Sequence, residues 1–175
     1  MENLGTFVIV RNEDPCSMDA QALLDEADAS RALLYGSKGR AKLFEEEVRA
    51  PRSRFLMVRT LSGFPVGCAA LTRVDYGAAE IKCIYSRADS AGIGYALLSR
   101  LELDASALGY RRLVLALRLA DRRTTAFCLR NGFQPAVRYF NEEAAQRNWY
   151  EKPLTPKVRS KEGSQSRNLP ENAPL

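Results

Sequence analysis

Ser90-Ala91-Gly92-Ile93-Gly94-Tyr95-Ala96-Leu97-Leu98 is the stretch of this sequence that decides its fold class. It follows a strand-like segment, residues 79–85, and opens an amphipathic helix whose apolar residues recur at helical spacing as far as Leu108. Two glycines at this strand-to-helix turn let backbone N–H groups point inward without a Cβ in the way. Those groups, with the positive end of the helix dipole, form a site for a phosphate or pyrophosphate. Many such turns use glycine for geometry alone, so the turn by itself leaves both interpretations open.

Five further segments accompany this turn along the chain. They are Phe64-Pro65-Val66-Gly67-Cys68-Ala69-Ala70-Leu71, Ala79-Glu80-Ile81-Lys82, Gly109-Tyr110-Arg111-Arg112-Leu113-Val114-Leu115, Asn131-Gly132-Phe133 and Glu151-Lys152-Pro153-Leu154. In their order and spacing they make residues 55–154 resemble the Gcn5-related N-acetyltransferases (the GNAT family), which are acetyl-CoA-dependent transferases. The resemblance implies an α/β fold with a mixed, mostly antiparallel central sheet, flanking helices and a splayed strand pair.

The length of 175 residues fits one domain with a proper core. We assign residues 1–154 to the N-acetyltransferase domain. From residue 155 to residue 175, Pro, Ser, Asn, Gln and charged residues dominate. Such a tail cannot bury enough apolar surface to offset its ordering entropy, and we expect it to be disordered.

Several function classes are excluded by composition. The chain has no histidine, which removes histidine-based triads and most catalytic metal sites, so we expect no metal. Its four cysteines are widely scattered, without a C-x-x-C pair, which argues against a disulfide framework or a zinc site. No apolar run approaches the roughly 20 residues that span a bilayer, and the N-terminus lacks the features of a secretory signal. We expect a cytoplasmic protein with no membrane partner.

The net charge of +5 raises the question of nucleic-acid binding. The last twenty residues contribute a net +2, and the remaining excess is spread over a chain that mixes both signs. No basic block is interleaved with aromatic residues, so we expect no nucleic-acid partner. Binding through the basic tail is the alternative, and its affinity would fall steeply with salt.

Local patterns predict the order of the secondary-structure elements. Strands are expected at residues 7–10, 55–58, 66–74, 79–85, 112–117, 133–140 and 149–154. Helices are expected from Ser17 onward and at residues 43–48, 93–108 and 122–130. In the first helix, Arg31 falls where the next residue of the apolar stripe should be. That helix therefore ends near Ser30, or continues with Arg31 at the edge of its buried face.

The resemblance implies where acetyl-CoA would bind. It assigns the pyrophosphate to the loop Ala91, Gly92, Ile93, Gly94, Tyr95 and Ala96. It assigns the pantetheine arm to the strand Ile84, Tyr85 and Ser86, where a backbone N–H near Ile84 would polarise the thioester carbonyl. The alternative for Ile84 and Tyr85 is a core strand, and both can hold because a backbone contact leaves the side chain free to pack.

Two residues and the length of one connection depart from the family pattern near this loop. Asp89 stands where members usually carry Arg or Gln, and the connection from the strand is about two residues shorter. A carboxylate near a pyrophosphate is unfavourable, and Arg87 is a candidate to supply the missing positive charge. Asp121 stands where members often carry Asn or Gln, and the resemblance makes it a candidate cofactor-binding residue. Arg122 and Arg123, which follow it, either meet the phosphates or are solvated.

Two residues are candidates for catalysis. Strand alternation predicts Glu80, Lys82 and Ile84 on one face and Ile81, Cys83 and Tyr85 on the other. Glu80 is the first choice for the general base that takes the amine proton, directly or through water. It could equally bind a cationic substrate or pair with Lys82 or an arginine. Cys128 falls where many members place a tyrosine that protonates the leaving thiolate, and the alternative is a small buried cysteine.

The expected reaction is direct attack of an amine on acetyl-CoA, with a small-molecule or amino-acid-like amine as acceptor. Acceptor contacts are expected around Leu34–Glu47 and Arg138–Asn148, with Arg138, Tyr139 and Tyr150 as candidates. One alternative is a protein N-terminal or lysine acetyltransferase. Another is a degenerate module that binds acyl-CoA without turnover. Members of the family often form homodimers, and the sequence identifies no interface.

Overall fold

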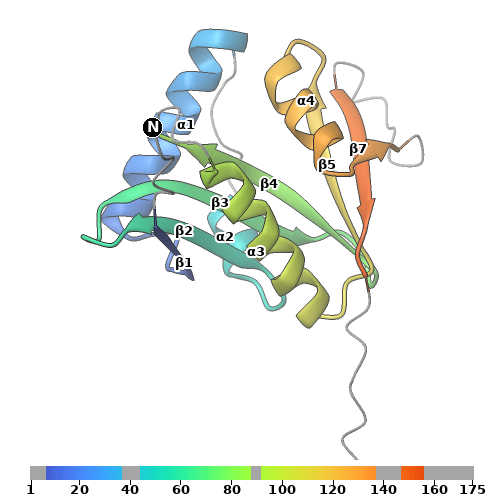
Figure 1. Cartoon of the computed structure of the whole chain (residues 1–175), viewed down its shortest axis with the longest axis horizontal. Coiled ribbons are helices and arrows are strands. Elements are labelled where there is room, and N and C mark those ends of the chain that lie inside the picture. Colours follow the sequence, from blue (N-terminus) through green and yellow to red (C-terminus); the bar gives the residue numbers. More distant parts are fainter. Residues whose placement is uncertain (1–6, 37–43, 88–91, 137–146, 156–175) are drawn as a thin grey trace, which may run out of the picture.

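The computed structural model describes residues 7–36, 44–87, 92–136 and 147–155. Its elements follow the predicted order (Figure 1). The strands are β1 (Val8–Asn12), β2 (Arg54–Thr60), β3 (Pro65–Arg73), β4 (Ala78–Ser86), β5 (Arg112–Arg118), β6 (Gln134–Pro135) and β7 (Arg147–Pro153). The helices are α1 (Met18–Tyr35), α2 (Phe44–Arg49), α3 (Ile93–Ala107) and α4 (Arg122–Arg130).

One seven-stranded sheet carries the fold, in the order β1-β2-β3-β4-β5-β7-β6. Its neighbouring strands are antiparallel except β4 and β5, which are parallel. The predicted fold class, a mixed and mostly antiparallel sheet with flanking helices, is therefore confirmed.

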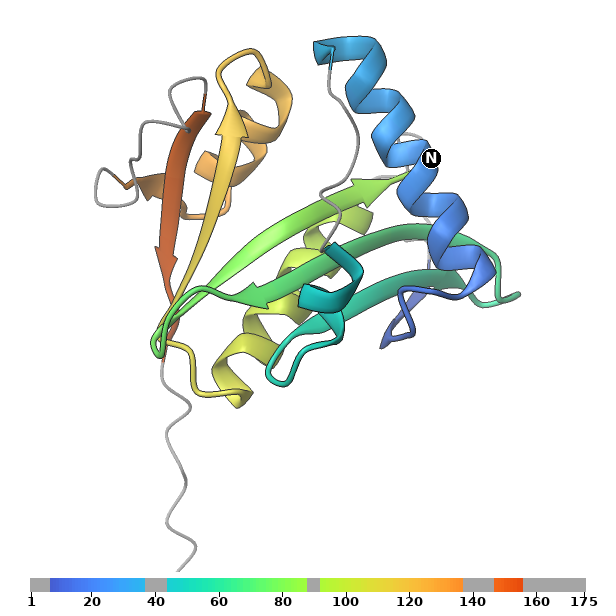
Figure 2. The same cartoon turned by 180° about the vertical axis from the view of Figure 1, so that it is seen from behind.

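Helices cover both faces of this sheet, and the core divides accordingly. α3 and α4 lie over one face, which is in front in Figure 1, and pack on the larger apolar cluster through residues such as Leu97, Leu101 and Cys128. α1 and α2 lie over the opposite face, which is in front in Figure 2. There Leu23 of α1 and Phe44 of α2 belong to a second, smaller cluster. No helix in the described ranges is long and apolar enough to cross a membrane.

The path of α1 resolves the question raised by Arg31. Ser17 caps the helix, since its Oγ accepts a hydrogen bond from the Ala20 N–H at 3.3 Å. The helix continues through Arg31 to Tyr35 and ends at Gly36, whose φ of +66° suits a left-handed C-cap. Arg31 thus lies within α1, at the edge of its buried face, as the second alternative predicted.

Some predicted features fall outside the described residues. Only Gln134–Pro135 of the strand expected at 133–140 is described as strand, and residues 137–146 cannot be compared. The same holds for Asp89, Ala91, Arg138 and Tyr139, and for the tail after residue 155.

Candidate active site

The site is built around an opening between β4 and β5. Three residue pairs join the strands, Ala78–Arg112, Ala79–Leu113 and Glu80–Val114. Beyond Glu80, the described residues show no further pairing between the two strands, which diverge into a V (Figure 1). The expected splayed strand pair is therefore present, and each strand keeps a backbone edge that its neighbour does not use.

A β-bulge in β4 corrects the predicted orientation of its side chains. Ala70 of β3 pairs with Cys83, whereas the next residue, Leu71, pairs with Ile81, so Lys82 is an extra residue in β4. Such a bulge shifts the side-chain alternation by one position.

The prediction that Glu80, Lys82 and Ile84 share one face is therefore wrong. Ile84 packs with Ile81 on the α3 side, whereas Cys83 packs on the α1 side. Lys82 also faces the α1 and α2 side, where it reaches a carboxylate of α2. The predicted grouping of Ile81, Cys83 and Tyr85 on the other face is wrong for the same reason.

Glu80 lies where the V begins, with its side chain 15% exposed. Its Oε2 is 2.8 Å from Lys82 Nζ, which is itself 3.8 Å from Glu47 Oε2 of α2. The ion pair with Lys82 was one of the alternatives that the sequence left open. It fixes the carboxylate at the base of the V without removing it from water altogether.

The end of β4 is tied to α1. Arg87 donates from Nε to Glu26 Oε2 at 2.7 Å and from Nη1 to the Pro65 carbonyl at 2.9 Å, and it lies over the Phe64 ring. The hydrogen bond from Arg87 lowers the pKa of Glu26. The Tyr85 hydroxyl donates to the same carboxylate at 3.5 Å. These contacts turn the guanidinium of Arg87 toward Glu26. Ser86 lies on the same strand end, paired with Gly67 of β3.

The turn at Gly92 opens α3 at the position that the sequence predicted. Gly92 is the N-cap in a left-handed conformation, with φ +99°, and no side chain caps the helix there. Among the described residues, a Cβ on Gly92 would meet no atom within 4 Å, whereas a Cβ on Gly94 would meet the Phe127 ring of α4 at 3.4 Å. The first glycine therefore serves the backbone conformation, and the second lets α4 approach α3.

The other residues of this loop have different surroundings. Ile93 is buried in the core, and Tyr95 is exposed. Ala96 donates its N–H to the Gly92 carbonyl as part of the helix. No acidic residue stands in the first turn of α3, so its N–H groups face no local carboxylate from the helix itself.

Asp121 is the N-cap of α4 and also a contact point for α1. Its Oδ1 accepts from the Thr124 N–H at 3.0 Å and from the Tyr35 hydroxyl at 3.2 Å. The Tyr35 carbonyl in turn accepts from Arg118 Nη1 of β5 at 3.4 Å. The last turn of α1 therefore reaches the β5 and α4 wall of the V. No local pattern indicates this contact, since Tyr35 and Asp121 stand 86 residues apart.

Cys128 is buried in the larger core cluster. Burial, with a smaller contribution from Asp121, raises its pKa to about 11. The thiol is thus protonated at neutral pH and can donate a hydrogen bond. Giving its proton to a thiolate of ordinary pKa, about 8.5, is uphill by roughly 3 kcal/mol. This favours the buried structural cysteine, and a role as general acid stays a prediction.

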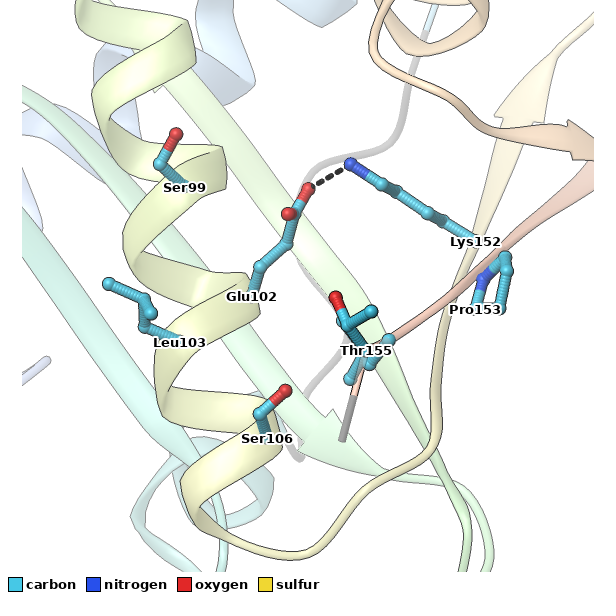
Figure 3. Close-up of a pocket in the computed structure, with 8 residues that line it drawn as sticks. Ser99, Glu102, Leu103, Ser106, Lys152, Pro153 and Thr155 are labelled. Carbon is cyan, nitrogen blue, oxygen red and sulfur yellow. Dashed lines mark hydrogen bonds and ion pairs between the residues drawn. The ribbon is translucent and has the colours of Figure 1, made fainter. Parts of the chain in front are cut away.

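A separate hollow of about 540 Å³ lies between α3 and the end of β7 (Figure 3). It is lined by Ser99, Glu102, Leu103, Ser106, Lys152, Pro153, Leu154 and Thr155. Lys152 crosses toward α3 and bonds Glu102 at 2.5 Å. None of the predicted site residues lines it.

Comparisons with known proteins agree with this geometry. The model of a family described as "Acetyltransferase (GNAT) family" matches residues 20–133. A curated protein, IAA acetyltransferase of Azospirillum brasilense, is 31% identical over 137 residues, which cover 73% of this chain and 89% of that protein. An acetyltransferase of the GNAT family from Staphylococcus aureus superposes with a TM-score of 0.69 at 16% identity, over 85% of this chain and 100% of the other. A GNAT acetyltransferase from Elizabethkingia anophelis with acetyl-CoA bound gives 0.63 at 18% identity, over 84% and 98%.

Proposed function

The chain belongs to the GNAT family of acetyltransferases, and from that premise we propose that it transfers the acetyl group of acetyl-CoA to the amine of a small molecule or amino-acid-like metabolite. The observation that carries the proposal is the V between β4 and β5. An extended chain needs a backbone edge to pair with, and β4 offers one beyond Glu80.

The described residues fit acetyl-CoA in two ways. The uncapped N-terminus of α3 at Gly92 suits a pyrophosphate, because its N–H groups and helix dipole favour an anion. The edge of β4 at Ile84, Tyr85 and Ser86 suits the pantetheine arm, and the bulge at Lys82 breaks the regular ladder where a thioester carbonyl would need an N–H donor.

The reaction forms one C–N bond and breaks one C–S bond. The acceptor nitrogen attacks the thioester carbon, and the thiolate leaves. Glu80 is the proposed base, because its carboxylate lies at the base of the V, where the ion pair with Lys82 at 2.8 Å holds it in place. It takes the amine proton directly or through water. The departing thiolate is protonated from solvent, and Cys128 contributes a hydrogen bond at most.

One observation favours a second candidate, a module that binds acyl-CoA without turnover. Arg87 was the candidate to offset Asp89, and its described contacts direct it to Glu26 and Pro65. If no other cation takes that place, the cofactor would bind weakly and in a poor position for reaction.

Calorimetric titration with acetyl-CoA tests the proposal, using the parent protein, Gly92→Glu and the control Gly63→Glu. Both glycines have positive φ, +99° and +88°, and a Cβ on either would meet no atom of the described residues within 4 Å. The two variants therefore share backbone strain, but Gly63 lies in the turn between β2 and β3. We expect micromolar binding by the parent and the control, and at least about 100-fold weaker binding by Gly92→Glu, because the new carboxylate occupies the phosphate site.

Turnover is then measured as thiol release with small amines and with peptides. Release with small amines supports the proposal. Release with peptides alone would assign a protein acetyltransferase, and binding without release would assign the inactive module. A parent protein that binds no acetyl-CoA overturns the proposal.

A further inference from the structure

Arg31 is an arginine in a position that the pattern of α1 assigns to an apolar residue. It follows Ala27, which is 2% exposed, by one helical turn. Its side chain is 37% exposed, so part of it is withdrawn from water and part of it remains accessible. Withdrawing a charge from water is costly unless the charge is paired. A leucine would complete the stripe without that cost, which raises the question of what the guanidinium does.

Two neighbours orient the guanidinium. Nη2 donates to Asp28 Oδ1 at 2.5 Å, and the group lies beside the thiol of Cys83 on β4. Burial opposes the charge, but Cys83 and Asp28 outweigh it, and the pKa of Arg31 is raised. The cation is therefore permanent, and its interactions with Asp28 and with Cys83 of β4 orient its planar fork.

The same helix face reaches the opposite wall. Tyr35, one turn beyond Arg31, contacts Arg118 of β5 and Asp121 of α4. Arg31 thus lies between the place where α1 contacts β4 and the place where it contacts β5 and α4, on the face of the sheet seen in front in Figure 2. The Gly92 turn belongs to α3, on the other face. The cofactor phosphates and Arg31 would therefore approach the V from opposite sides.

The bulge places Cys83, the neighbour of Arg31, on the side of the sheet where Lys82 pairs with the proposed base. Lys82 joins Glu80 to Glu47 of α2, and Cys83, which contacts Arg31, faces the same side. Glu80 and Cys83 are three residues apart, about 10 Å along a regular strand and less across a bulge. An α-amino acid hydrogen-bonded at both its amine and its carboxylate spans about 9 Å between its two partners.

We propose that Arg31 binds the carboxylate of the acceptor, so that the preferred acceptors are α-amino acids or closely related amines that carry a carboxylate. A guanidinium has five N–H donors in a fork that matches a carboxylate. Among the described residues, Asp28 and Cys83 engage part of that fork, and the accessible remainder can face the V. Glu80 then receives the amine at the other end of the acceptor. This inference rests on the proposed acetyltransferase function.

The test compares amino acids with their amides, which keep the amine and the side chain and lose the carboxylate. Arg31→Leu restores the apolar stripe, and Arg31→Lys keeps the charge without the fork. Arg100→Leu is a matched control, because Arg100 also forms an intrahelical pair, with Asp104, at similar exposed fractions of 40% and 16%. Arg100 belongs to α3 and donates to the Val10 carbonyl of β1, away from the V.

The quantity compared between proteins is the ratio of kcat/KM for the acid to kcat/KM for the amide. The amine of an amide is less basic than that of the acid, and this difference affects the ratio equally in every protein. One charge-assisted hydrogen-bonded contact corresponds to about a 10- to 100-fold preference. We expect that preference in the parent and in Arg100→Leu, a smaller one in Arg31→Lys, and none in Arg31→Leu. Binding of N-acetyl amino acids and their amides to the CoA-saturated protein, measured by calorimetry, gives a readout that needs no turnover.

The outcomes separate the two proposals. Acetylation of acids and amides with ratios that do not change in Arg31→Leu overturns the role of Arg31 and leaves the acetyltransferase function standing. Absence of acetylation, with selective binding of the carboxylates that Arg31→Leu abolishes, overturns the function and supports the anion site. Equal binding of carboxylates and amides by the parent overturns the inference.

Discussion

Gly67 of β3 sets the distance between the sheet and the first turn of α3, and replacing it tests whether that distance matters for the site. A Cβ at Gly67 would lie 2.8 Å from the Tyr85 carbonyl oxygen and 2.9 Å from Ile93 Cγ2. One neighbour is β4 backbone beside the proposed pantetheine edge, and the other is the first residue of α3. Alanine at this position must therefore move one of the two groups on which cofactor binding depends.

The size of the effect follows from these distances. Ordinary contact begins at 3.4 Å, so the Tyr85 carbonyl must retreat by about 0.6 Å and Ile93 by about 0.5 Å, unless Gly67 itself moves. Overpacking of this kind costs about 1–3 kcal/mol. For a domain of this size, that free energy lowers Tm by about 3–10 °C. The same displacement moves the Gly92 turn relative to β4. We expect acetyl-CoA to bind about 5- to 50-fold more weakly, because misplaced donors lose much of their hydrogen-bond energy.

Thermal unfolding and calorimetric titration of Gly67→Ala measure the two effects, with Gly77→Ala as the control. A Cβ on Gly77 would meet atoms of the Arg111 side chain at 3.4 Å or more, and a flexible side chain can yield. We expect the control to match the parent within about 1 °C and in its dissociation constant. A Gly67→Ala protein that unfolds at the parental temperature and binds acetyl-CoA normally would refute this account of how α3 is positioned.

Two further predictions concern charge and reactivity. Because Arg87 lowers the pKa of Glu26, this carboxylate contributes stability that is present above its unfolded pKa, about 4.3, and is lost as pH falls through the lower folded value. Glu26→Gln should therefore be less stable than the parent at pH 7, by no more than about 1 kcal/mol because the Glu26 side chain is 40% exposed. Chemical denaturation should show this difference in unfolding free energy shrinking below pH 4. A difference that stays constant with pH contradicts the ion-pair account. Because burial raises the pKa of Cys128 to about 11, iodoacetamide at pH 8 should modify the exposed Cys16 and spare Cys128. Cys128→Ala should change kcat by less than about threefold. Rapid labelling of Cys128, or a large loss of kcat in Cys128→Ala, would support Cys128 as the general acid.

Local patterns in the sequence were sufficient for the elements and much of the core. The stripe of Ala20, Leu23, Leu24 and Ala27 is fully or nearly fully buried, and the Gly92 turn opens a helix where the sequence predicted one. These features depend on residues that are close in sequence, where helical periodicity and glycine chemistry act directly.

The bulge at Lys82 could not be found in this way. Its origin is the pairing of β4 with β3, where one residue of β4 has no counterpart between Ala70 and Leu71. Strict alternation was therefore right up to Lys82 and wrong from Cys83 onward. The contacts of Arg87 with Glu26 and of Tyr35 with Asp121 span 61 and 86 residues. Each becomes visible only when the topology sets α1 across the sheet.

The two walls of the V are held together differently at its base and at its mouth. At the base, the β4 and β5 pairs are reinforced by an ion pair between Asp75 and Arg112 at 3.0 Å. Toward the mouth, the described links from α1 are the hydrogen bonds of Tyr35 with Arg118 and Asp121. The base is therefore a hydrogen-bonded ladder, whereas the contacts of α1 with the mouth, as far as the described residues show them, are made through side chains. On the proposed roles of these residues, the ladder would hold Glu80 in place, and an acceptor would enter from the mouth beside Arg31. The position of Arg31 in α1 is consistent with a role in binding. The apolar stripe that holds α1 to the sheet ends before Arg31, at Ala27, so the charge does not weaken that packing.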